Sequence, residues 1–115
     1  MAAANAYFMN GVPELLLLRL LQGREMYGYE LVQAIRRETG EAVVLAEGVV
    51  YPVLHGLERD GALISTRKTV NGRSRIYYAL SPAGQTRLSE LSANWSRLAC
   101  AIQKLIAGGD HVQTA

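Results

Sequence analysis

The chain has 115 residues, of which half are hydrophobic and 19% are charged, and its formal net charge is +2. This length supports one domain with a modest core, and the composition excludes a disordered chain. The net charge is too small to identify a nucleic-acid partner, so the local distribution of charge has to be considered.

Several classes of protein are not expected from this sequence. Its single cysteine, Cys100, allows no intramolecular disulfide and suits a reducing compartment. The first residues lack the basic segment of a signal peptide. The longest nearly apolar run, residues 15–21, is interrupted by Arg19 and is too short to span a bilayer. We therefore expect a cytoplasmic protein with no membrane partner.

The first half of the chain is expected to be helical. Residues 1–10 are expected to form a flexible segment. A helix over residues 13–21 is apolar on nearly all sides, so it needs more cover than a chain of this size can supply alone. A second helix is expected over residues 27–39, ended by Gly40. Residues 43–45 form a short apolar extended piece that could add a minor strand.

A third helix is expected from residue 47 to the Asp60-Gly61 pair. It lacks a good cap, because neither Ala46 nor Glu47 is a preferred N-cap residue. At 100° per residue, its apolar side consists of Val50, Val53, Leu54 and Leu57. The opposite side presents Gly48, Pro52, His55 and Arg59, flanked by Val49, Tyr51 and Gly56.

A β-hairpin follows the third helix. Residues 63–70 and 75–80 have the composition of strands, and Asn71-Gly72 between them is a strong turn signal. A type I′ turn needs positive φ at both central positions, which Asn and Gly tolerate. From residue 61 to residue 80 there is no carboxylate, and the cations are Arg67, Lys68, Arg73 and Arg75.

The last helix is expected to begin with Ser81 as cap and Pro82 as first residue, and to end near residue 107. Its apolar residues alternate at spacings of three and four: Leu88, Leu91, Trp95, Leu98, Ile102 and Leu105. A helix of this length spans roughly 39 Å and overhangs the preceding elements. Its apolar stripe therefore needs a partner, most simply a second copy across a two-fold axis. Residues 108–115 are expected to form a disordered tail.

The order of these elements predicts a mostly α protein with a small β-hairpin. Residues 11–80 would form a winged helix-turn-helix, and residues 81–107 a C-terminal dimerisation helix. In such a fold the third helix enters the major groove of DNA, and the hairpin, or wing, contacts phosphates or the minor groove. The candidate DNA-contacting residues are Tyr51, Pro52, His55, Arg59, Arg67, Lys68, Arg73 and Arg75.

The exposed side of the third helix has few side chains suited to reading bases. Hydrogen-bonded readout favours Arg, Lys, Asn or Gln, and here only Arg59 and His55 have the reach. His55 is equally well interpreted as an ordinary surface histidine. Tyr51 can donate its hydroxyl to a phosphate. We therefore expect phosphate contacts and shape to dominate binding.

Trp95, the single tryptophan, has two interpretations. It can anchor the dimer interface, since it lies in the middle of the apolar stripe. It can also form one wall of a flat apolar pocket between subunits, where two rings related by the two-fold axis sandwich a planar guest. The two roles are compatible.

No catalytic site, metal site or cofactor is expected. His55 and His111 have no second ligand at a suitable spacing. The sequence contains no nucleophile elbow, CxxC pair, phosphate loop or plausible pair of catalytic carboxylates. An enzyme is therefore not expected. The alternative to a DNA-binding regulator is a winged-helix module whose wing binds an acidic protein partner.

Four stretches resemble the PadR family of bacterial transcriptional regulators. They are Tyr-Gly-Tyr-Glu-Leu at 27–31, Glu-Gly-Val-Val-Tyr-Pro-Val-Leu at 47–54, Leu-Glu-Arg-Asp-Gly-Ala-Leu-Ile at 57–64, and Gly-Arg-Ser-Arg-Ile-Tyr-Tyr-Ala-Leu-Ser-Pro-Ala-Gly at 72–84. The resemblance covers about residues 13–106. The family often has Thr after the glycine of the third helix and Ser nearby as its cap, where this sequence has Val49 and Ala46-Glu47.

The resemblance implies a homodimeric winged-helix repressor that leaves its operator when a ligand binds. The single C-terminal helix is similar to that of short-tailed members of the family, some of which respond to drugs or other small aromatic compounds. In those members an aromatic residue on this helix lines a pore between subunits, and residues 94–97 fall in the corresponding stretch. The resemblance thus implies a small aromatic effector near Trp95.

Overall fold

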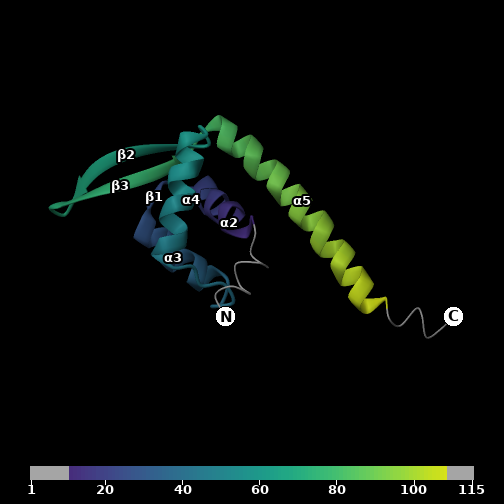
Figure 1. The fold of residues 1–115 in the computed structure, drawn as a ribbon. Helices are drawn as coiled ribbons and strands as arrows, with labels where there is room; N and C mark the ends of the chain where they lie inside the picture. Colours follow the sequence, from purple (N-terminus) through teal and green to yellow (C-terminus); the bar gives the residue numbers. More distant parts are fainter. Residues whose placement is uncertain (1–10, 109–115) are drawn as a thin grey trace.

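The computed structural model describes residues 11–108, so the expectations for residues 1–10, for most of the tail and for His111 lie outside the described residues. The described part is mostly helical and carries one hairpin that projects from the helices (Figure 1). Its elements are, in order, α2 (Val12–Gly23), β1 (Met26–Tyr27), α3 (Gly28–Glu38), α4 (Glu47–Arg59), β2 (Leu63–Val70), β3 (Arg73–Leu80) and α5 (Pro82–Ala107).

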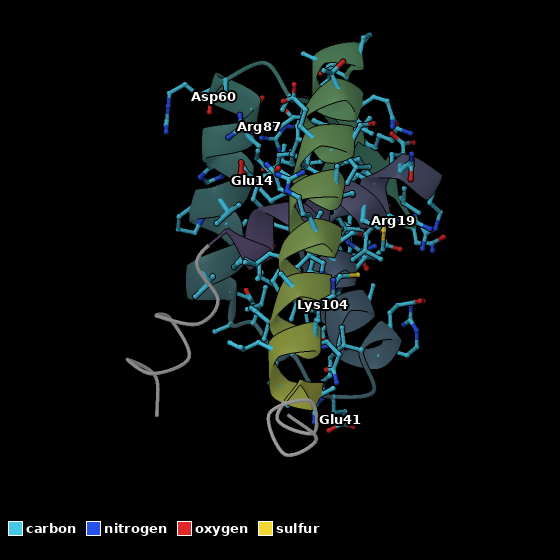
Figure 2. The ribbon with its side chains drawn as sticks, turned by 90° about the vertical axis from the view of Figure 1, so that its right-hand side faces the viewer. Glu14, Arg19, Glu41, Asp60, Arg87 and Lys104 are labelled. Atoms are coloured by element: carbon cyan, nitrogen blue, oxygen red, sulfur yellow. The ribbon has the colours of Figure 1, made fainter. Side chains whose placement is uncertain are left out.

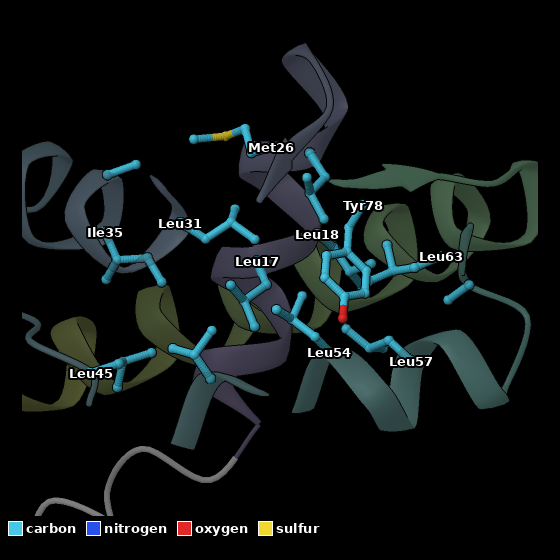
Figure 3. Packing of buried hydrophobic residues seen from close by; sticks show 14 of the residues in the cluster. Leu17, Leu18, Met26, Leu31, Ile35, Leu45, Leu54, Leu57, Leu63 and Tyr78 are labelled. Carbon is cyan, nitrogen blue, oxygen red and sulfur yellow. The ribbon is translucent and has the colours of Figure 1, made fainter. Parts of the chain in front are cut away.

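The core lies between the first three of these helices and the base of the hairpin (Figure 3). The largest fully buried side chains come in pairs from the three helices: Leu17 and Leu18 from α2, Leu31 and Ile35 from α3, and Val50 and Leu54 from α4. Full burial of such a side chain contributes about 1.5–3 kcal/mol. The predicted apolar side of the third helix is confirmed, with Val53 only partly buried.

The sheet has three strands in the order β1-β3-β2, and all pairs are antiparallel. Its minor strand is β1, in which Met26 lies opposite Tyr78. The possible strand at residues 43–45 was therefore wrong. The chain there turns around Thr39, whose hydroxyl donates to the Ile35 carbonyl at 2.7 Å and accepts from the Val43 N–H at 3.0 Å.

The turn of the hairpin has the predicted geometry. Asn71 has φ 52° and Gly72 has φ 78°, so both central positions are in the left-handed region that a type I′ turn requires. Val70 lies opposite Arg73, and β3 begins at Arg73, two residues before the predicted start. The tight turn continues the ladder to the tip, which makes a long two-stranded wing (Figure 1).

Helix α5 begins at a buried joint with the corner between α4 and β2. Ser81 caps the helix, because its hydroxyl accepts from the Gly84 N–H at 3.0 Å while donating to the Gly61 carbonyl at 2.6 Å. The Ser81 N–H also donates to the Ala62 carbonyl at 3.0 Å. A Cβ atom on Gly84 would lie 2.1 Å from the Ala62 carbonyl oxygen, so only glycine permits this approach.

Arg87 reinforces this joint from the first turns of α5. Its guanidinium forms ion pairs with Glu14 of α2 and with Asp60 at the end of α4, the latter at 3.3 Å. Figure 2 shows the three side chains gathered near the start of α5. The beginning of α5 is thus tied to two other helices by charge as well as by backbone contacts.

The distal half of α5 extends beyond the rest of the chain (Figure 1). The radius of gyration is 17.0 Å, whereas a compact chain of this length would have roughly 13 Å. The large apolar side chains exposed on this part of the helix are Trp95, Leu98, Ile102, Leu105 and Ile106. Among the described helices, none is long and apolar enough to cross a membrane.

Candidate nucleic-acid interface

The side of α4 that faces away from the core is exposed and low in relief. Gly48, Pro52, His55 and Arg59 are all exposed, as the helical spacing predicts. A Cβ atom on Gly48 would meet no other atom within 4 Å, so the backbone here faces open space. The N-cap residue Ala46 makes no side-chain cap, as predicted. A surface with so few long side chains can approach another molecule closely.

Tyr51 lies at the edge of this surface and packs back onto the protein. A Cβ atom on Gly28 would lie 2.4 Å from Cζ of Tyr51, so the ring covers the start of α3. Burial raises the pKa of Tyr51, and Glu47 and Tyr27 raise that pKa further. Its hydroxyl therefore stays protonated at neutral pH and can donate a hydrogen bond, but its ring is held against α3.

His55 and Arg59 occupy the later turns of α4. The centroid of the His55 ring lies 6.3 Å from that of Tyr51, with the two planes tilted by 46°. Arg59 is in the last turn, where a cation suits the helix dipole. Both side chains are exposed, so they are the long polar groups that this side of α4 presents.

Two of the four wing cations are held by contacts with β1, with the residue just before it and with β3. Lys68 forms an ion pair with Glu25, and its Nζ atom lies 5.3 Å from the centroid of the Tyr77 ring. Arg75, directly opposite Lys68 in the ladder, places its Cζ atom 4.3 Å from the centroid of the Tyr27 ring. Glu25, which is distant in sequence, thus places a carboxylate against a hairpin that contains no acidic residue.

The other two wing cations are more accessible. Arg73 is exposed beside the turn, and Arg67 is exposed on the neighbouring strand. Arg67 donates to the Ser74 hydroxyl at 3.0 Å. Because this partner is neutral, the positive charge of Arg67 is not balanced by it. The structure therefore separates the four predicted cations into an accessible pair, Arg67 and Arg73, and an engaged pair, Lys68 and Arg75.

The exposed apolar stripe lies on a different part of the molecule, along the distal half of α5. Trp95 is 48% exposed, Leu98 53% and Ile102 49%. Their spacing of three and four residues places them on one side of the helix. Cys100 is also exposed, but its position in the helix puts it outside this stripe.

The described residues also bear on a possible metal site. Within residues 11–108, no three His, Cys, Asp or Glu side chains lie close enough together to hold a metal ion. The side-chain clusters on these surfaces are the wing cations with their aromatic and carboxylate partners, and the apolar stripe of α5.

Comparisons with known proteins agree with this architecture. The model of the PadR-like transcriptional regulator family matches residues 17–90. The transcriptional regulator Rv3488 of Mycobacterium tuberculosis is 32% identical over 104 residues, which are 90% of this chain and 92% of that protein. A solved structure of a transcriptional regulator from Clostridium thermocellum is 28% identical and superposes with a TM-score of 0.78, covering 84% of this chain and 95% of the other.

A solved PadR family transcriptional regulator from Eggerthella lenta gives a TM-score of 0.77 at 26% identity, covering 91% of this chain and 90% of the other. These likenesses confirm the predicted fold class, a winged helix-turn-helix followed by a long C-terminal helix. They also confirm the resemblance drawn from the sequence. The chain belongs to the PadR-like family of transcriptional regulators.

Proposed function

We propose that the chain is a homodimeric repressor that binds a double-stranded DNA operator and is released from it by a small, flat aromatic ligand. The observation that carries this proposal is the combination of an exposed α4 side, an arginine-bearing wing and a long helix with an uncovered apolar stripe. The first two suit DNA, and the third suits a second copy of the chain.

The DNA-binding part of the proposal assigns a role to each surface. Helix α4 enters the major groove, and the wing reaches adjacent backbone. Contacts come from Tyr51, Pro52, His55, Arg59 and the four wing cations. Arg67 and Arg73 contribute most of the wing's attraction for phosphate, because Glu25 already neutralises Lys68 and Arg75 lies on Tyr27. Two copies would bind half-sites about one helical turn apart, roughly 34–36 Å.

Replacement of Arg73 by Gln tests the role of the wing. Each phosphate contact contributes about 0.9 to the slope of log K against log salt concentration, because counterions are released on binding. We expect Arg73→Gln to weaken binding to all duplexes and to flatten this slope by about one unit. Lys68→Gln should change the slope less, because Glu25 pairs with Lys68 in the free protein. Fluorescence anisotropy with labelled duplex over a range of salt concentrations measures both effects.

The matched control is Arg97→Gln, which removes an exposed arginine from α5, outside the wing. Its slope should equal that of the unaltered protein. An unchanged slope for Arg73→Gln would remove this residue from the DNA interface. If the protein binds no duplex at any salt concentration, the alternative function gains support. In that alternative the wing binds an acidic protein partner.

The ligand part of the proposal concerns Trp95. A half-exposed indole in the middle of an apolar stripe would face its symmetry mate across a two-fold interface, and a planar aromatic compound fits between two such rings. A ligand there would change the packing of the two long helices and hence the spacing of the two α4 helices. A coupling of about 1–3 kcal/mol, or 5–150-fold in affinity, would release the operator.

Titration with planar aromatic compounds tests this ligand site. We expect quenching of Trp95 fluorescence, since Trp95 is the single tryptophan. The same compound should release operator DNA from the unaltered protein but not from Trp95→Leu, a variant that keeps an apolar side chain in the stripe. If no compound in a varied set of planar aromatics quenches the fluorescence, Trp95 has a purely structural role.

A further inference from the structure

The exposed side of α4 presents an unusual choice of residues at the end that would lie deepest in a major groove. In DNA-reading helices of this type, the N-terminal residues contact the edges of the bases. Here those residues include Gly48, Val49 and Pro52, all exposed. Val49 keeps 43% of its surface exposed, although valine is a residue that folding normally buries.

Hydrogen-bonding side chains are scarce at this end of α4. From Glu47 to Glu58 the helix has no Arg, Lys, Asn or Gln, the residues that form paired hydrogen bonds with guanine and adenine. Arg59 is in the last turn, two turns or more away from Val49. The ring of Tyr51 is held against Gly28. Direct hydrogen-bonded readout by the first turns of α4 is therefore limited.

Apolar side chains can still distinguish one base from the others in the major groove. Thymine carries a C5-methyl group there, and aliphatic side chains make favourable contacts with it. Close approach is required, because dispersion contacts act only near van der Waals distance. Gly48 allows this approach, since its backbone faces open space next to Val49.

We propose that α4 reads thymine through its C5-methyl group, with Val49 as the main contact and Pro52 as the second. This inference rests on the proposed DNA-binding function and adds to it the chemical basis of sequence recognition. It makes Val49 a specificity-determining residue, while Arg67 and Arg73 supply affinity that does not depend on sequence.

Substitution of deoxyuridine for thymine tests the inference, because it removes the methyl group and leaves every hydrogen-bonding atom of the base in place. The unaltered protein first selects its preferred duplex from a randomised pool. Each thymine of that duplex is then replaced in turn, and affinity is measured at one salt concentration. We expect at least one position at which deoxyuridine weakens binding about fourfold, as the loss of one buried methyl group predicts.

Val49→Ala should abolish the sensitivity to deoxyuridine at that position. The variant protein should then bind the thymine and deoxyuridine duplexes with equal affinity. The side chain is exposed, so its truncation leaves the core intact. The matched control is Ile64→Ala, which truncates an aliphatic side chain that is 55% exposed on β2 and should retain the fourfold difference. This cycle of two changes isolates the contact between one side chain and one methyl group.

Two results would overturn the inference while leaving the proposed function intact. One is equal affinity for every deoxyuridine duplex. The other is a Val49→Ala variant that keeps the full difference at every sensitive position, with Pro52→Ala keeping it as well. If the unaltered protein selects no duplex from the pool, the proposed function fails and this inference fails with it.

Discussion

Replacing Leu98 and Ile102 together with glutamate is expected to separate the protein into monomers and to lower operator affinity by a factor of about 10²–10⁴. Both side chains are about half exposed in the single chain, so the substitutions leave its own core intact. In the proposed dimer they would place carboxylates in an apolar interface without partners, which is strongly unfavourable. Without the dimer, each α4 binds its half-site alone.

Analytical ultracentrifugation gives the oligomeric state, and a gel shift on the operator gives the affinity. The matched control is Ser96→Glu with Cys100→Glu, which adds the same charge at the same spacing on exposed positions outside the stripe. The control should remain dimeric and bind DNA. If the Leu98→Glu, Ile102→Glu protein stays dimeric, the subunits associate through another surface.

Substitution of alanine for Gly84 is expected to lower the free energy of unfolding by about 3 kcal/mol, at the upper end of the usual range for overpacking. The new Cβ would lie 2.1 Å from the Ala62 carbonyl oxygen, which is backbone and cannot rotate away. Either α5 or the corner between α4 and β2 has to move. Urea denaturation measures the loss, at one fixed protein concentration because dimerisation contributes to stability.

Gly48→Ala is the matched control for this substitution. Gly48 is also helical, but no atom lies within 4 Å of the added Cβ. Alanine there should raise the free energy of unfolding by about 0.5–1 kcal/mol, because alanine loses less backbone entropy on folding than glycine does. Equal effects at the two positions would mean that the contact of Gly84 with Ala62 does not constrain the fold.

The elements with strong local signals were predictable from the sequence. Asn71-Gly72 fixed the turn because few residues tolerate positive φ, and Ser81-Pro82 fixed the start of α5. The side of α4 that enters the core also followed from helical spacing. In each of these cases the information lies within a few consecutive residues.

Strand β1 was not predictable, and residues 43–45 were proposed in its place. Two residues are too few to show the alternation that identifies a strand, and Met26 and Tyr27 pair with residues far along the chain. The apolar run at 43–45 instead delivers Leu45 to the core. Sheet membership cannot be inferred from such short patterns.

The sequence identified candidate residues for the DNA interface, but it did not predict the contacts that these residues make. The sequence presents Arg67, Lys68, Arg73 and Arg75 as equivalent cations. The structure distinguishes them through Tyr27 of β1 and Glu25 just before it, which lie against the wing because β1 pairs with β3. The position of Glu25, 43 residues before Lys68, gives no local sign of this pairing. The same holds for Tyr51, whose contact with Gly28 appears only once α3 and α4 are packed together.

The buried joint at the start of α5 gives this helix the properties of a lever. Ser81, Gly84 and Arg87 fix one end of the helix to the α4 corner, while Trp95 lies further out, roughly 20 Å along the axis. Because the joint is stiff, a tilt of α5 carries α4 with it. A tilt of about 5° corresponds to a shift of roughly 2 Å at Trp95, comparable with the helix shifts of known allosteric interfaces. In the proposed dimer, a planar guest between two tryptophans would therefore move the α4 helices as rigid bodies. The stiffness of the joint then determines how much of the ligand's binding energy reaches the DNA.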